Sequence, residues 1–180
     1  GRAGLQCDRK GREHVELWDV LNEHGEKTGR TIWRGQMLPP GDFHLVVHIW
    51  ISNEQGDYLI QKRAEHLEWK PGMWAATGGS VIAGEDSLAG ALRETHEELG
   101  LVLDATYLSR IARLVRFDSN SIVDVWLAEV SGLAVGDLKP GPEVSEVKWV
   151  SRSELGHMVS VGDFYRHSYL EWLLDRPISE

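Results

Sequence analysis

Residues 79–101 read GSVIAGEDSLAGALRETHEELGL, and this stretch decides how the chain folds. On an α-helix, which turns by roughly 100° per residue, one set of its side chains falls within about 60° and forms a stripe that can pack on a core. These side chains are Leu88, Leu92, Thr95 and Leu99. We therefore predict a helix over residues 87–99, capped by Asp86 or Ser87 and ended by Gly100 in the left-handed conformation.

The other side of this helix carries the clustered acids Glu94, Glu97 and Glu98. At spacings of three and four residues like charges are surface neighbours, and each such pair costs about 0.2–0.5 kcal/mol. An ordinary solvated helix face is one interpretation, because glutamate is a good helix former. The other interpretation is a functional site, at which a cation or a substrate compensates the charge.

The stretch resembles the Nudix box, the signature of the Nudix hydrolase superfamily, whose pattern is G-x5-E-x7-R-E-U-x-E-E-x-G-U with U a bulky aliphatic residue. The matching positions are Gly79, Glu85, Arg93, Glu94, Glu97, Glu98, Gly100 and Leu101. Thr95 departs from the pattern, but threonine has nearly the shape of valine, so the departure concerns packing and not the charged set. Residues 44–63 and 69–79 also resemble the strand, hairpin and glycine-rich approach of Nudix domains.

The resemblance implies a Nudix-type diphosphohydrolase, which cleaves the diphosphate linkage of a nucleoside diphosphate derivative or a similar small organic diphosphate. It also implies Mg²⁺ or Mn²⁺ as the cofactor, because carboxylates alone would repel a substrate with several negative charges. Hard oxygen ligands suit these cations. A bound cation polarises the phosphoryl group and lowers the pKa of the attacking water.

By the same resemblance the metal ligands, which are also catalytic residues, are Glu94, Glu97 and Glu98. The backbone of Gly79 is a further candidate metal ligand, and Gly78 beside it allows a close approach of the backbone. Arg93 is expected to orient the carboxylates as part of the catalytic set. Glu85 is expected to support the site on its substrate side.

The general base lies outside the box in many members of the family. The candidates are Glu143, Glu146 or a glutamate of the box itself, and the sequence does not choose among them. We retain Glu146 as a catalytic candidate. Surface charge is the alternative interpretation for both residues, because exposed acids are common.

Three further residues are candidates for substrate binding. Arg63 closes an apolar strand and can contact a phosphate, although a solvated strand end is equally compatible with its position. Trp74 can stack on a base or cover a prenyl chain, although tryptophans are mostly buried. His48 would face the same way as His44 on an apolar strand, which suits a structural or substrate-lining role better than a metal site, since no third ligand is visible.

Two alternatives to hydrolysis stay open. Residues 18–31, WDVLNEHGEKTGRT, resemble the branch of the superfamily that includes isopentenyl diphosphate isomerases and their hydrolase relatives, so an isomerase or another enzyme acting on prenyl diphosphates is one alternative. Such isomerases rely on a cysteine just after the strand that enters the box, and residues 72–80, GMWAATGGS, contain none. A non-catalytic Nudix-fold binding module is the other alternative, which the complete acidic set disfavours.

The rest of the sequence predicts an α/β fold. Strands are expected at residues 15–20 and 28–33, which form a hairpin, and at 43–52, 57–63, 104–117, 122–130 and 146–150. A short helix begins after its cap, Ser151, and residues 161–176 are expected to form a last amphipathic helix. This order fits a mixed sheet with helices on both faces, the α/β/α sandwich of Nudix proteins. Residues 1–13 are expected to be a tag remnant or a disordered leader, and residues 14–180 a single domain.

Composition narrows the class of function. The 180 residues carry a formal net charge of −9, which argues against electrostatic binding of a nucleic acid polymer. No apolar run reaches the ~18 residues of a membrane span. The one cysteine, Cys7, predicts a reducing compartment, so we expect a cytoplasmic enzyme with a small-molecule substrate. The first hairpin is a candidate homodimer contact.

Overall fold

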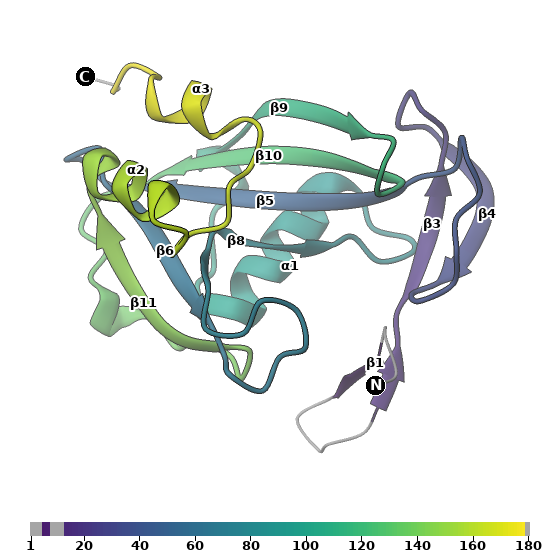
Figure 1. Ribbon diagram of the computed structural model, residues 1–180, viewed down its shortest axis with the longest axis horizontal. Coiled ribbons are helices and arrows are strands. Elements are labelled where there is room, and N and C mark those ends of the chain that lie inside the picture. The colour runs from purple at the N-terminus through teal and green to yellow at the C-terminus, as the bar shows by residue number, and fades with distance from the viewer. Residues whose placement is uncertain (1–4, 8–12, 179–180) are drawn as a thin grey trace. The chain divides into compact units, whose positions relative to one another are not determined.

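Figure 1 shows the computed structural model, which describes residues 5–7 and 13–178. Its strands are β1 Leu5–Cys7, β2 Glu13–Val15, β3 Leu17–Leu21, β4 Lys27–Trp33, β5 His44–Ser52, β6 Tyr58–Arg63, β7 Trp74–Ala75, β8 Thr77–Ser80, β9 Leu108–Arg116, β10 Ser121–Glu129 and β11 Val144–Val150. Its helices are α1 Ser87–Leu99, α2 Arg152–Ser160 and α3 Leu170–Leu174, with short 3-10 turns at Ala105–Tyr107 and Val135–Asp137.

The chain divides into two compact units. The first unit takes in the residues up to 48 together with 78–91 and 110–126, and the second takes in 49–77, 92–109 and the residues from 127 onward. The long strands follow the order β11-β6-β5-β10-β9, with β7 paired to β6 and β8 paired to β5. This mixed sheet, flanked by helices, confirms the predicted α/β class. No helix among the described residues is long and apolar enough to cross a membrane.

In the first unit, β3 and β4 form the predicted hairpin, with Trp18 opposite Ile32. Asn22 closes its turn, because its side-chain oxygen accepts hydrogen bonds of 3.0 Å from the backbone N–H groups of His24 and Glu26. Within residues 1–13, β1 pairs with β2, which begins at Glu13, and the other residues of that segment lie outside the described part of the chain.

The core of the second unit is built on Trp50, which is fully buried. Its ring contacts three other aromatic rings, those of Tyr58, Phe164 and Tyr169. Its indole nitrogen donates a hydrogen bond of 3.1 Å to the Tyr169 hydroxyl, so the one polar atom of this large side chain is satisfied. The core therefore draws on β5, β6 and the segment between α2 and α3.

The C-terminal helix is shorter than predicted. Residues 161–169 are not helical, and α3 holds only Leu170–Leu174. The backbone of this segment is engaged elsewhere, because Trp74 donates to the carbonyl of Asp163 and accepts from the N–H of Tyr165, at 3.0 and 3.3 Å. Phe164, between them, is buried as a bridge partner of Trp74. A pairing across ninety residues of sequence thus overrides the helical periodicity.

Candidate active site

The helix of the box has the predicted bounds, Ser87–Leu99, and well-defined ends. Asp86 is the N-cap, because its carboxylate accepts a hydrogen bond of 2.8 Å from the N–H of Ala89. At the other end Gly100 has the predicted left-handed conformation, with φ 65°. A side chain there would lie only 2.6 Å from the carbonyl oxygen of Lys139, so glycine is required on both grounds.

The acids of this helix differ in their surroundings. Glu94 is 7% exposed, whereas the side chain of Glu97 is 55% exposed and Glu98 is half-buried. The interpretation of these acids as an ordinary solvated helix face therefore does not hold for Glu94. Arg93 explains how this acid can be buried, because its guanidinium donates hydrogen bonds of 3.1 Å to Glu94 and 3.2 Å to Glu97.

The chemistry of these acids fits a divalent cation, since carboxylate oxygens are the donors that Mg²⁺ and Mn²⁺ prefer. Over residues 5–7 and 13–178, however, no three His, Cys, Asp or Glu side chains are gathered closely enough to hold a metal ion as they stand. Arg93 occupies one oxygen of Glu94 and one of Glu97. A cation therefore has to compete with this guanidinium for the carboxylates.

The box residues that precede the helix belong to the first unit. Glu85 accepts a hydrogen bond of 3.0 Å from the N–H of Ile82 and so closes the turn before α1. Gly78, beside Gly79 in β8, leaves no room for a side chain, because an added Cβ would lie 2.5 Å from the carbonyl oxygen of Val47. The same Cβ would lie 3.2 Å from the ring of His48. The predicted close approach of the backbone at Gly78 therefore occurs next to His48, a candidate for substrate binding.

His44, which precedes His48 on β5, is held by packing and by a contact with the backbone. Its ring stacks on Trp18, with centroids 4.0 Å apart and planes 8° apart, and its Nδ1 lies 3.2 Å from the carbonyl oxygen of Asn120. The pKa of His44 is lowered to about 4, mainly by burial and also by the nearby charge of Arg34, while the carbonyl of Asn120 acts in the opposite direction. His44 is therefore neutral near pH 7 and serves packing.

Apart from His48, the predicted candidates outside the box lie in the second unit. Arg63 donates from Nε to the carbonyl oxygen of Trp69 at 2.8 Å, and Trp74 lies under the ammonium group of Lys148, which is 4.6 Å from the ring centroid. Glu143 and Glu146 are both exposed, the latter opposite Lys62 on the neighbouring strand.

Asp124 was not among the predicted residues, and it is fully buried on β10. Its carboxylate accepts bonds of 2.6 and 2.8 Å from Arg113 and one of 2.6 Å from the hydroxyl of Ser87, with Arg110 at 3.6 Å. Trp126 donates to the same hydroxyl at 3.0 Å. An acid inside the apolar run 122–130 was the available signal, because a charge there has to be paired.

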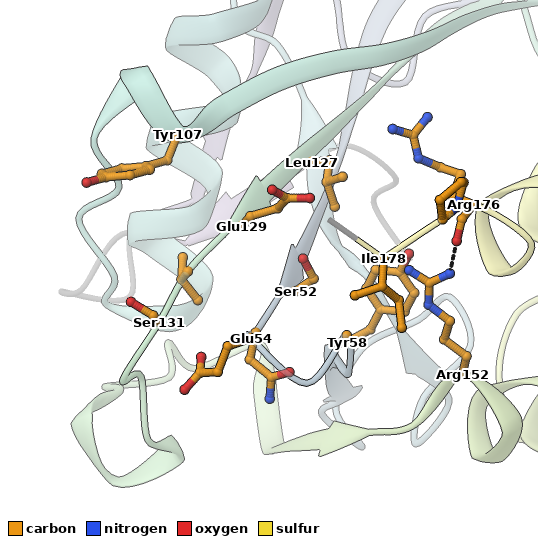
Figure 2. Close-up of a pocket in the computed structure, with 14 residues that line it drawn as sticks. Ser52, Glu54, Tyr58, Tyr107, Leu127, Glu129, Ser131, Arg152, Arg176 and Ile178 are labelled. Carbon is orange, nitrogen blue, oxygen red and sulfur yellow. Dashed lines mark hydrogen bonds between the residues drawn. The ribbon is translucent and has the colours of Figure 1, made fainter. Parts of the chain in front are cut away.

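Each of the two units contains a cavity. A cavity of 340 Å³ in the first unit is lined by Glu85 and by Arg110, Arg113 and Trp126, among others. A cavity of 540 Å³ in the second unit, shown in Figure 2, contains none of the predicted site residues. Arg152 stands at its edge and donates to the carbonyl oxygen of Arg176. The second cavity is larger but is not where the box chemistry lies.

A model of the NUDIX domain matches residues 42–173 of the chain. The chain belongs to the Nudix family. An uncharacterized Nudix hydrolase of Listeria monocytogenes is 36% identical to it over 163 residues, which make up 89% of this chain and 95% of the relative. A crystal structure of the protein DR0079 from Deinococcus radiodurans matches over 88% of this chain and 97% of its own, with a TM-score of 0.71, and at 22% identity it shows a shared fold.

Members of the isomerase branch also match this Nudix chain. An isopentenyl-diphosphate Delta-isomerase of Streptomyces avermitilis is 30% identical to it, over 81% of this chain and 76% of the relative. The resemblance to that branch, predicted from residues 18–31, is confirmed.

Proposed function

We propose that this Nudix protein is a divalent-cation-dependent hydrolase that cleaves the diphosphate linkage of a small organic diphosphate. The observation that carries the proposal is the arrangement on α1. Glu94, Glu97 and Glu98 have the spacing i, i+3 and i+4, and the guanidinium of Arg93 donates hydrogen bonds to the first two. The hydrogen bonds from Arg93 hold these carboxylates in fixed positions, which is what the ligands of a cation site need.

In the reaction, water adds to one phosphorus atom, the bridging P–O bond breaks, and each product keeps one phosphate. Glu94, Glu97 and Glu98 would hold Mg²⁺ or Mn²⁺, which when bound supplies charge neutralisation and polarises the phosphoryl group. Arg93 orients Glu94 and Glu97 through its two hydrogen bonds. The proton of the attacking water passes to a carboxylate, for which Glu143, Glu146 and the box acids are the candidates.

The test is Glu98→Gln, which keeps the size of the side chain and removes its charge. Changing residues that merely orient ligands costs 10–100-fold, so loss of a ligand should lower kcat/KM by about 100-fold or more. Release of phosphate from a panel of nucleoside and prenyl diphosphates, with Mg²⁺ or Mn²⁺ titrated, measures it. Glu23→Gln, an exposed acid of the β3–β4 turn, is the matched control and should leave the rate unchanged. A Glu98→Gln protein that hydrolyses at the wild-type rate would refute the assignment.

The isomerase relatives favour a second candidate, an enzyme that acts on prenyl diphosphates. Residues 72–80 contain no cysteine, and Cys7 lies on β1, far away in the sequence, so we propose hydrolysis and not isomerisation. Incubation with isopentenyl diphosphate decides the matter, since formation of the dimethylallyl isomer would contradict the proposal. Binding of diphosphates without any cleavage, in the presence of Mg²⁺ or Mn²⁺, would instead support the non-catalytic module.

A further inference from the structure

The last turn of α1 is closed by a distant segment of the chain. An α-helix leaves the carbonyl groups of its last turn without partners inside the helix. Two of these, on Glu98 and Leu99, accept hydrogen bonds of 3.0 and 2.9 Å from the N–H groups of Gly141 and Lys139. We call residues 139–141 the strap. The end of the box helix is therefore held by backbone bonds from a segment far along the chain.

Gly141 is the point at which the strap approaches the helix most closely. A Cβ added to Gly141 would collide with the carbonyl oxygen of Glu97. The φ of Gly141 lies outside the left-handed region, so the approach to α1, and not the backbone conformation, requires glycine. Gly136, earlier in the same connection, also lies outside that region, and a Cβ there would meet nothing within 4 Å. The lack of a side chain therefore matters at Gly141 and not at Gly136.

The other backbone group of Gly141 is tied to the strand β11. Its carbonyl oxygen accepts a hydrogen bond of 3.1 Å from the N–H of Val144, the first residue of that strand, and so closes a turn that contains Glu143. The carbonyl of Glu143 in turn accepts a bond of 2.9 Å from the N–H of Ala64, the residue after β6. Gly141 thus links α1 to β11 through its own N–H and C=O groups.

We propose that Gly141 is a positioning residue, which holds the last turn of α1 where Glu97 and Glu98 bind a divalent cation. The inference rests on the proposed function, because it takes these acids as ligands. Mg²⁺ requires nearly ideal octahedral geometry, so a small displacement of the turn weakens the site. A helix cap alone needs only an N–H donor, which any residue except proline supplies. The close approach at the carbonyl of Glu97 goes beyond capping, because it fixes where the turn lies.

The test compares Gly141→Ala with Gly136→Ala, the same change at a glycine that has free space. Uptake of Mn²⁺ without substrate is followed by the loss of the electron paramagnetic resonance signal of the free ion. We expect Gly141→Ala to raise the dissociation constant of Mn²⁺ by about tenfold or more and Gly136→Ala to leave it unchanged. Urea unfolding of the same samples gives the folded fraction. A purely structural Gly141 would lower stability and leave the Mn²⁺ affinity of the folded protein at the wild-type value, which would overturn the inference.

A measurement on the wild type covers the case in which Gly141→Ala does not fold. If the strap holds the ligands in place, a bound cation must by linkage oppose opening of the strap. Mg²⁺ at about ten times its dissociation constant should slow hydrogen exchange of the Gly141 amide by about tenfold. The control is the amide of Asp137, which is bonded to the carbonyl of Ala134 at 3.0 Å outside the strap. No slowing at Gly141, or equal slowing at Asp137, would contradict the inference.

The wild type also separates this inference from the proposed function. Wild-type protein that takes up no Mn²⁺ would sink the proposed function, and the inference with it. Wild-type uptake that Gly141→Ala leaves unchanged would sink the inference alone. Neither the Mn²⁺ titration nor the exchange measurement requires a bond to be cut, so both are independent of the Glu98→Gln rate measurement.

Discussion

Two groups of arginine and carboxylate in this chain use the same chemistry to different ends. Around Asp124, in the first unit, the carboxylate is fully buried, and both its oxygens receive bonds shorter than 2.9 Å. Around Arg93, in the second unit, the bonds are 3.1 and 3.2 Å and Glu97 stays exposed. The carboxylate of the first group is buried and bonded by protein groups on both oxygens. The second group keeps the side chain of Glu97 accessible, and an accessible carboxylate is what a cation site needs.

The largest expected effect is on the free energy of unfolding, and it distinguishes the group around Asp124 from the group around Arg93. Asp124→Asn removes the charge that Arg113 and Arg110 share, and breaking a buried pair in this way should lower the free energy of unfolding by about 3–4 kcal/mol. Urea unfolding measures the loss, and the metal concentration that gives half-maximal hydrolysis should not change in the folded fraction. Arg110→Gln is the control, because at 3.6 Å and 45% exposure this side chain contributes little. Equal losses from the two variants would show that Asp124 is not the organising group.

These two groups also show where sequence patterns suffice. The bounds of α1, the cap at Ser151 and the left-handed Gly100 were predictable, because each depends on residues within one or two turns of the chain. The loss of helix at 161–169 was not predictable, since it depends on the pairing of Trp74 with Phe164. Burial of Glu94 likewise depends on tertiary packing. Local signals thus give the elements and the charged set, while nonlocal contacts decide which charges are available.

A pH titration sharpens the contrast, because a buried group without an opposite charge behaves differently from Asp124. His44 faces Trp18, the carbonyl of Asn120 and the like charge of Arg34, and its pKa in the folded protein is about 4. Between that value and its ordinary pKa of about 6.5, the unfolded chain binds a proton that the folded chain does not. Stability should therefore fall as the pH falls from 7 to 4, by about 3 kcal/mol.

Urea unfolding at a series of pH values measures this slope for the wild type and for His44→Gln. The variant should be less stable at pH 7, since it loses the ring stacked on Trp18, but its slope between pH 7 and 4 should be flatter. His24→Gln is the control, because that side chain is 72% exposed and makes no buried contact. A His44→Gln slope as steep as that of the wild type would assign the pH dependence to other groups.

The smallest effect tests the second group, and it concerns activity more than stability. Arg93→Gln keeps a donor near Glu94 and Glu97 but removes the charge that orients them, so kcat/KM should fall by about 10–100-fold, equivalent to about 1.4–2.7 kcal/mol of barrier. Hydrolysis and urea unfolding, followed on the same samples, separate the two effects, and the stability loss should be smaller than for Asp124→Asn. The control is Arg30→Gln, because Arg30 pairs with Asp42 through two short bonds on the surface and should affect neither quantity. An Arg93→Gln protein that is strongly destabilised at unchanged kcat/KM would place Arg93 with Arg113, as a structural arginine, and erase the distinction between the two groups.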